Sequence, residues 1–176
     1  FSRTSFSEDF GLLKEIRKEC PEIKVLHIDN VNPIFVATQK GEEITKAIVQ
    51  YCSSGNIAAH GVESFDAVVT KDNLLNCNAE MALKAIRVIN KYGAERGENG
   101  MPKFLPGINI IFGLKAESRK THADNMKYLQ QILSENLLLR RINIRQAALF
   151  EGTKLYDDCG DKFLKKNRKY YWKWRN

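Results

Sequence analysis

The amino-acid sequence predicts an α/β protein with a parallel sheet of four strands and helices between the strands. The first supporting observation is that helical and strand patterns alternate along the chain of 176 residues. The second is that the strand candidates are short and mostly apolar, as buried parallel strands are. The third is the composition, 43% hydrophobic, which is enough for the core of one domain.

In the first half of the chain, two helices and two strands are predicted in alternation. Apolar residues at helical spacing predict helices over Ser7–Cys20 and Ile44–Cys52. Serine is favoured as the residue before a helix, and Pro21 ends the first helical pattern. The short apolar stretches Lys24–Asp29 and Asn56–Val62 predict the first two strands.

The second half continues the alternation. Helices are predicted over Asn78–Gly93 and Ser118–Glu135, where apolar residues recur at helical spacing. Gly107–Leu114 is the most continuous apolar run and predicts the third strand, and Leu139–Phe150 predicts the fourth. The glycine- and proline-rich loop before the third strand is long for a connection, so we expect it to be functional or mobile.

The net charge of +7 resides in the C-terminal segment. Lys162–Arg175 contains seven cations and no acid, so the rest of the chain is neutral overall. Cations interleaved with aromatic rings suit single-stranded RNA, because cations neutralise phosphates and rings stack on bases. The alternative is an amphipathic helix or linker that packs on a following domain. The nucleic-acid candidates are Lys165, Lys166, Arg168, Lys169, Trp172 and Trp174.

Several classes of function find no support in the sequence. The four cysteines are far apart, so no metal ligands are predicted, and unpaired thiols indicate a reducing, cytoplasmic compartment. No apolar run approaches the length of a membrane span. Phosphate-binding, dinucleotide-binding and serine-hydrolase motifs are absent. Neither Lys24 nor Lys115 is placed for Schiff-base chemistry. Because the chain begins at Phe1, we expect it to be a piece of a longer protein.

Polar residues follow each predicted strand. Ligands of parallel α/β proteins bind at the carboxyl ends of the strands, so these residues are expected to share one rim. Carboxylates and amides at such a rim suit a polar small molecule, for example a ribose with its two hydroxyls. Capping of turns and helices is the alternative role for the acids and for serine. In the last strand, Arg141, Asn143 and Arg145 alternate with Ile142 and Ile144, so this strand is either an edge strand or lines a polar site. The rim candidates are Asp29, Asn30, Asn32, Glu63, Ser64, Gly113, Glu117, Asn143, Arg145 and Gln146.

Three segments, in order, resemble radical S-adenosylmethionine enzymes. His60–Ser64, with Asp66 after it, is similar to the G-x-E-S segment that follows the fourth strand of that family. Leu105–Ser118 looks like the fifth-strand segment, and Arg140–Thr153 looks like the sixth strand and its G-T turn. The resemblance implies that residues 1–155 are the later part of a (β/α)6 partial TIM-like barrel. Residues 156–176 would be a basic aromatic helix or linker.

The resemblance also implies an activity and a cofactor. Enzymes of this family use a four-iron four-sulfur cluster on a CxxxCxxC loop to cleave S-adenosylmethionine into a radical that abstracts hydrogen from substrate. That loop is absent here, so the fragment alone would be inactive, and its partners would be the missing N-terminal half and a possible C-terminal domain. The implied cofactor-binding residues are Glu63, Ser64, Ile111, Gly113, Glu117, Arg145 and Gln146. The substrate-side residues would be Asp29, Asn30, Asn32 and Asn143.

Overall fold

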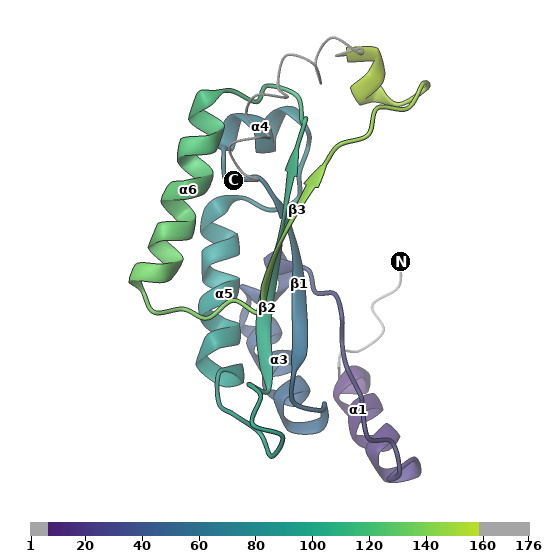
Figure 1. Ribbon diagram of the computed structural model, residues 1–176. Helices are drawn as coiled ribbons and strands as arrows, with labels where there is room; N and C mark the ends of the chain where they lie inside the picture. Colours follow the sequence, from purple (N-terminus) through teal and green to yellow (C-terminus); the bar gives the residue numbers. More distant parts are fainter. Residues whose placement is uncertain (1–6, 159–176) are drawn as a thin grey trace.

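The structure is a computed structural model that describes residues 7–158. Three parallel strands form one sheet in the order β1-β2-β3 (Figure 1). They are β1 (Asn56–Glu63), β2 (Phe104–Phe112) and β3 (Arg141–Gln146). The α/β character and the parallel strand direction are therefore as predicted.

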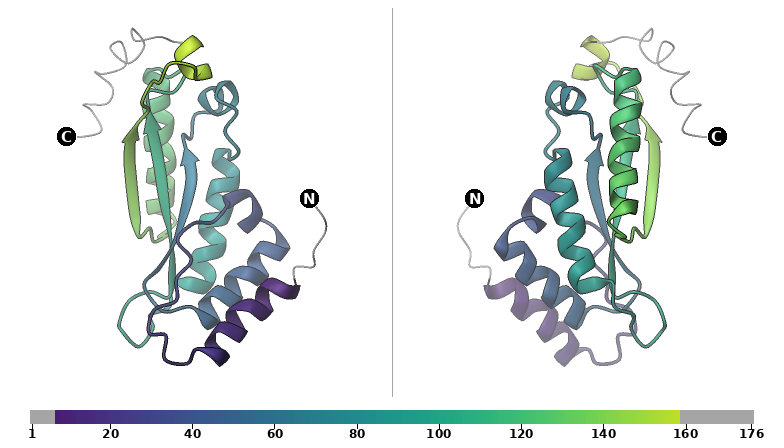
Figure 2. Two further views of the ribbon diagram at one scale, coloured as in Figure 1. Left: turned by 90° about the vertical axis from the view of Figure 1, so that its right-hand side faces the viewer. Right: turned by 90° about the vertical axis from the view of Figure 1, so that its left-hand side faces the viewer.

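Long helices cover one face of this sheet. In Figure 2, α5 and α6 lie behind the sheet in the left view and in front of it in the right view. The helices on this face are α3 (Gln39–Tyr51), α5 (Ala79–Gly93) and α6 (Arg119–Ser134), and the fourth long helix, α1 (Ser7–Glu19), packs against α3. Two short helices, α2 (Pro33–Val36) and α4 (Ala67–Asp72), were not predicted. Asn32 caps α2 and Asp66 caps α4, each accepting a hydrogen bond from a backbone N–H inside its helix.

The prediction of a four-stranded sheet that forms part of a (β/α)6 barrel is wrong, because Lys24–Asp29 is not a strand. This segment runs beside β1 but forms only one bridge with it, between Asn30 and Ala59. Here, side chains bind backbone N–H groups that would otherwise form hydrogen bonds with a neighbouring strand. The Ser53 hydroxyl accepts from the N–H of Leu26 at 3.0 Å, and the Asn56 side-chain oxygen accepts from that of Ile28, also at 3.0 Å.

The core lies between the sheet and its helices. Ile108 and Ile110 of β2 are fully buried against residues of α5 and α6. Phe104, at the start of β2, packs with Ile89 of α5 and Ile48 of α3. Burying such side chains is the main favourable contribution to folding. The helices are therefore held on this face by apolar packing.

The other face of the sheet is called the open face below, because α3, α5 and α6 all lie on the opposite side. Side chains of paired residues on parallel strands point to the same side, so the register assigns the residues of each face. Gly61 pairs with Asn109, which pairs with Asn143, and Ile111 pairs with Arg145. The open face carries Ala59, Gly61, Gly107, Asn109, Ile111, Arg141, Asn143 and Arg145.

The long loop before β2 is held by backbone hydrogen bonds. The N–H of Gly97 donates to the Met101 oxygen at 2.9 Å, and that of Lys103 donates to the Glu95 oxygen at 2.8 Å. The N–H of Gly55, just before β1, donates to the Pro102 oxygen at 2.7 Å. These bonds make the loop an ordered turn at the amino ends of the strands, remote from the rim.

Arg17 joins α1 to the rest of the molecule. Its guanidinium donates to the Tyr51 oxygen at 2.7 Å, the Ile23 oxygen at 2.6 Å and the Ser53 hydroxyl at 2.9 Å. We expect Arg17→Ala to lower the free energy of unfolding by about 2–3 kcal/mol in urea titrations, because three acceptors lose their donor. Lys18→Ala, which removes only exposed ion pairs, should change it little. Equal losses for the two variants would contradict this role of Arg17.

Candidate functional site

The strongest candidate site lies on the open face, near the carboxyl ends of the strands. Glu63 ends β1 at a bulge, and its φ of 61° is in the left-handed region that residues other than glycine rarely adopt. A Cβ atom on Gly61 would lie 3.0 Å from Glu63 Oε1. The Glu63 carboxylate therefore lies over Gly61 on the open face, in the space that a larger residue at position 61 would fill.

The Glu63 carboxylate is incompletely satisfied. Its Oε2 atom is buried and has no hydrogen-bond partner among the described residues. Burial raises the pKa of Glu63, and the positive charge of Arg145 partly opposes that shift. A strained backbone that holds a buried, unpaired carboxylate oxygen is typical of a group positioned for a ligand.

Asparagines surround this carboxylate in a cavity of about 320 Å³, called the asparagine pocket below. Amide side chains both donate and accept hydrogen bonds, so several of them around one carboxylate can hold the hydroxyl groups of a sugar. Cys77 also lines the pocket. Burial raises the pKa of its thiol to about 11, so the thiol is uncharged at neutral pH. The polar lining consists of Asn30, Asn32, Glu63, Asn76 and Asn109.

Arg145 lies across the sheet from Glu63. The two residues project from the outer strands, and the charge of Arg145 acts on Glu63. On the central strand, Arg145 pairs with Ile111 and Glu63 pairs with Ile110. An anionic group, an apolar side chain and a cationic group thus form a row across the open face. This row is complementary to a ligand that carries both charges and an apolar or planar part.

Ser64 and Asp66 form a buried structural network. The Ser64 hydroxyl is fully buried and accepts from the Asp66 N–H at 3.2 Å. Asp66 accepts from the Val68 N–H at 2.9 Å and from the Thr121 hydroxyl at 2.7 Å, which ties α4 to α6. The structure therefore gives both side chains capping roles, and contact between Ser64 and a cofactor stays a prediction.

Glu117 and Gly113 meet at the end of β2. Gly113 adopts a φ of 85° and donates its N–H to Glu117 Oε2 at 3.0 Å, while Glu117 Oε1 is buried without a partner among the described residues. Burial raises the pKa of Glu117, the N–H groups of Gly113 and Leu114 lower it, and the charge of Asp66 raises it further. Glu117 is therefore a second buried carboxyl group with a raised pKa at the rim.

The remaining rim candidates fall into two groups. Asn30 and Asn32 line the asparagine pocket and Asn143 lies on the open face, so they join the site. Asp29 is exposed, and only its backbone oxygen is engaged, by the N–H of Ala59. Gln146 lies next to Arg145 in the strand, so its side chain projects to the opposite face.

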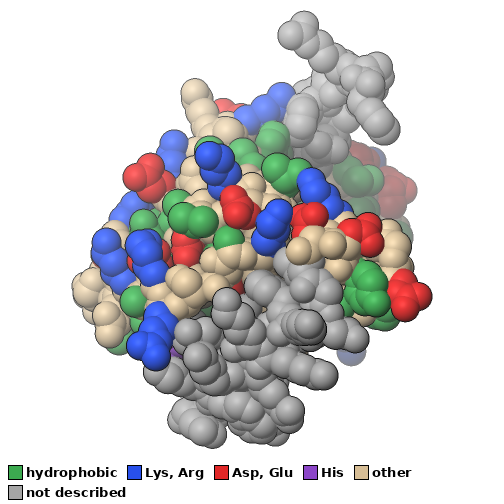
Figure 3. Space-filling view, turned by 90° about the horizontal axis from the view of Figure 1, so that it is seen from above, with side chains coloured by type: hydrophobic (Ala, Val, Ile, Leu, Met, Phe, Trp, Pro, Cys, Tyr) green, Lys and Arg blue, Asp and Glu red, His purple; other side chains and the backbone are tan. Residues whose placement is uncertain are grey.

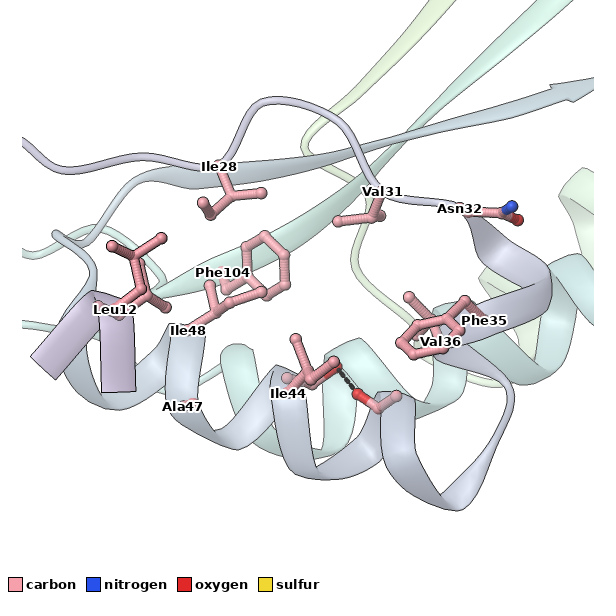
Figure 4. Close-up of a pocket in the computed structure, with 13 residues that line it drawn as sticks. Leu12, Ile28, Val31, Asn32, Phe35, Val36, Ile44, Ala47, Ile48 and Phe104 are labelled. Carbon is pink, nitrogen blue, oxygen red and sulfur yellow. Dashed lines mark hydrogen bonds between the residues drawn. The ribbon is translucent and has the colours of Figure 1, made fainter. Parts of the chain in front are cut away.

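A second cavity, of about 510 Å³, lies between α1, α3 and the segment beside β1. Figure 4 shows Leu12, Ile44 and Phe104 pointing into it from separate elements. Among the described residues that line it, none is ionisable, and the Thr45 hydroxyl donates to the Gly41 oxygen at 2.8 Å. This cavity has no chemistry for catalysis, and the asparagine pocket remains the candidate site.

The surface at the carboxyl ends of the strands is mixed in charge. Figure 3 shows Lys and Arg side chains interspersed with Asp and Glu side chains there. Within residues 7–158, no cluster of three histidine, cysteine or acidic side chains could hold a metal ion. No helix in this range has the length and apolar character needed to cross a bilayer. The nucleic-acid candidates of Lys162–Arg175 lie outside the described residues.

Sequence patterns missed two residues of this site. Asn76 precedes α5, and nothing in the local pattern connects it with Glu63. Asn109 is the one polar residue in an apolar strand, which is a usable signal for a polar site beside a central strand. Arg141 shares one side of β3 with Asn143 and Arg145, as their alternation with isoleucine predicts, and β3 is an edge strand of the described sheet.

The comparisons with known proteins give relatives without an assigned activity. No family model matches the chain. It is 47% identical over 159 residues to an uncharacterized protein of Archaeoglobus fulgidus, covering 89% of this chain and 30% of that protein. It is 46% identical over 151 residues to an uncharacterized protein of Methanocaldococcus jannaschii, covering 85% of this chain and 28% of that protein. The chain therefore spans less than a third of the length of these relatives.

Proposed function

We propose that this chain is the cofactor- and substrate-binding part of a radical S-adenosylmethionine oxidoreductase. The single observation that carries the proposal is the Glu63 carboxylate, whose buried Oε2 lacks a partner among the described residues and which lies over Gly61 in the asparagine pocket. Glu63 is also the acidic residue of the segment that resembles the G-x-E-S motif of the family. Geometry and resemblance thus support the same residue.

The residues at the rim fit the parts of S-adenosylmethionine. Its ammonium and sulfonium groups are cationic and would be attracted to Glu63, while the amides of Asn30 and Asn109 can bind the ribose hydroxyls. Ile111 offers an apolar contact for the adenine ring, and Gly113, without a side chain, allows the ring to approach the backbone. Arg145 would hold the carboxylate of the methionine part.

The bound cofactor would supply a radical that takes a hydrogen atom from substrate, and the reducing electron would come from a cluster outside the described residues. The residues of this chain bind and orient.

Titration calorimetry of the chain with S-adenosylmethionine tests the role of Glu63. We expect Glu63→Gln to weaken binding about tenfold or more, because the charge is lost and the shape is kept. Glu80→Gln, at an exposed position of α5, should leave the affinity unchanged. Because the pKa of Glu63 is raised, acidification should protonate it and weaken binding by the wild type but not by Glu63→Gln. Equal affinity of Glu63→Gln and wild type would refute the assignment.

The class of enzyme is tested on the long relative from Archaeoglobus fulgidus. After anaerobic reconstitution with iron and sulfide, we expect a brown protein that cleaves S-adenosylmethionine when dithionite is added. A protein that binds no cluster and cleaves no cofactor would overturn the class, even if this chain bound the cofactor.

A second candidate function, binding of single-stranded RNA, is favoured by the charge of Lys162–Arg175, which equals the net charge of the chain. A gel-shift series at increasing salt tests it. Binding that weakens with salt and is lost when residues 162–176 are deleted would support it, and salt-independent binding would dismiss it.

A further inference from the structure

The side chain of Arg141, at the start of β3, lies across the open face above Gly107. A Cβ atom on Gly107 would lie 3.1 Å from Arg141 Cγ and 3.5 Å from Arg141 Nε. The side chain therefore extends from β3 over the central strand, and it can do so because position 107 is glycine. Ile57 Cγ2 lies 3.1 Å from the same Cβ position, so Arg141 and Ile57 converge over Gly107 from the two neighbouring strands.

The guanidinium of Arg141 is available for an anion. Arg141 is exposed, and no carboxylate of the described residues lies within 4.0 Å of it. Arg145, four residues further along β3, projects to the same face. The charge of Arg145 interacts with Glu63. Arg141, in contrast, forms no ion pair with a described residue.

A pair of amides lies next to Arg141. Asn143 Nδ2 donates to Asn109 Oδ1 at 2.8 Å, across two paired strands. That bond uses one donor of Asn143 and one lone pair of Asn109, which leaves the Asn109 NH2 and the Asn143 oxygen to face a ligand. The side chains alternate along a strand, so Asn109 follows Gly107 on the open face at a distance of about 7 Å. Gly61 pairs with Asn109 on the other side, where the Glu63 carboxylate lies over it.

We propose that this part of the open face binds one nucleotide, with its phosphate on Arg141 and its base against the Asn109–Asn143 pair. The planar guanidinium matches the oxygens of a phosphate, and a donor beside an acceptor matches the hydrogen-bonding edge of a base. Arg141 lies over Gly107, and the backbone positions of Gly107 and Asn109 are about 7 Å apart, which is within reach of a single nucleoside monophosphate. The inference goes beyond the proposed cofactor site, because its phosphate contact, Arg141, is not part of that site and needs no S-adenosylmethionine, although Asn109 is shared by the two sites.

Calorimetric titration of the chain with cytidine and guanosine 5′-monophosphates, and with cytidine and guanosine, tests the phosphate contact. Pyrimidine and guanine probes avoid the adenine part of S-adenosylmethionine. We expect each nucleotide to bind at least about tenfold more tightly than its nucleoside, and Arg141→Ala to remove that difference. Arg140→Ala is the matched control, since it removes the same charge from an exposed residue just before β3 that is not among the nearest neighbours of Gly107, and it should retain the difference.

Two further variants separate contact from general charge. Asn109→Ala should weaken the nucleosides as well as the nucleotides, and Gly107→Ala should weaken only the nucleotides, because its methyl group displaces Arg141. Equal losses for Arg140→Ala and Arg141→Ala, or nucleosides that bind as tightly as nucleotides, would overturn the inference. Competition by malate as effective as that by the nucleotides would also overturn it, in favour of a carboxylate site. Because no cofactor is added, the outcome does not depend on the role of Glu63.

Discussion

Gly93→Ala is expected to destabilise the protein by about 3 kcal/mol, although alanine is the better helix former. Gly93 is the last residue of α5, and a Cβ atom there would lie 2.0 Å from the backbone oxygen of Phe104, at the start of β2. Backbone cannot move aside without separating α5 from the sheet. Urea-induced unfolding of both proteins, followed by circular dichroism, measures the difference.

Gly11→Ala is the control for that experiment. Gly11 also lies in a helix, α1, but an added Cβ would have no neighbour within 4 Å. The same substitution should therefore raise the free energy of unfolding by up to about 1 kcal/mol. Changes of the same sign in the two variants would contradict the close contact between α5 and β2.

Acidification from pH 7 to pH 4 is expected to cost about 3 kcal/mol of stability through His60 alone. His60 of β1 is fully buried, and neither ring nitrogen has a hydrogen-bond partner among the described residues. Burial lowers the pKa of His60 to about 4, from an ordinary value of 6.5. Between these two values the unfolded chain binds a proton that the folded protein does not, so stability falls as the pH falls.

Urea titrations at several pH values measure this effect. In His60→Leu the contribution should vanish, and the variant should be less sensitive to acid than the wild type. Burial raises the pKa values of Glu63 and Glu117, so these two groups stabilise the folded protein as the pH falls. They are present in both the wild type and His60→Leu, so the difference between these two proteins reports on His60. His27→Leu, at an exposed position, should behave as the wild type does. An unchanged acid sensitivity in His60→Leu would show that the ring is solvated or bonded in the folded state.

Sequence patterns were sufficient to predict the long helices and the three strands of the described sheet, with β3 lying inside the predicted Leu139–Phe150. They predicted α1, α3, α5 and α6, and they located β1 and β2 within three residues at each end. They failed at Lys24–Asp29, where the side chains of Ser53 and Asn56 take backbone groups that a strand would pair. Such competition is set by tertiary contacts and leaves no local pattern.

The candidate site was predictable only in part. Glu63 could be found because it ends a strand within a recognisable segment, but its left-handed backbone and its place over Gly61 could not. Asn109 and Arg141 depend on strand register, and a shift of one residue would move each to the opposite face. Polar residues at strand ends therefore identified the rim, whereas the open face required the structure.

The most direct test of the cofactor site is a titration of the nitrogen-15-labelled chain with S-adenosylmethionine, followed by amide chemical shifts. If the ligand binds at the carboxyl ends of the strands, the largest shifts will occur at Gly61, Glu63 and Gly113, and Glu63→Gln will reduce them at equal ligand concentration. Amides at the ordered loop of residues 94–103, at the other end of the strands, will not move. Largest shifts at the apolar cavity around Ile44, or no shifts at any residue under saturating ligand, would contradict the assignment.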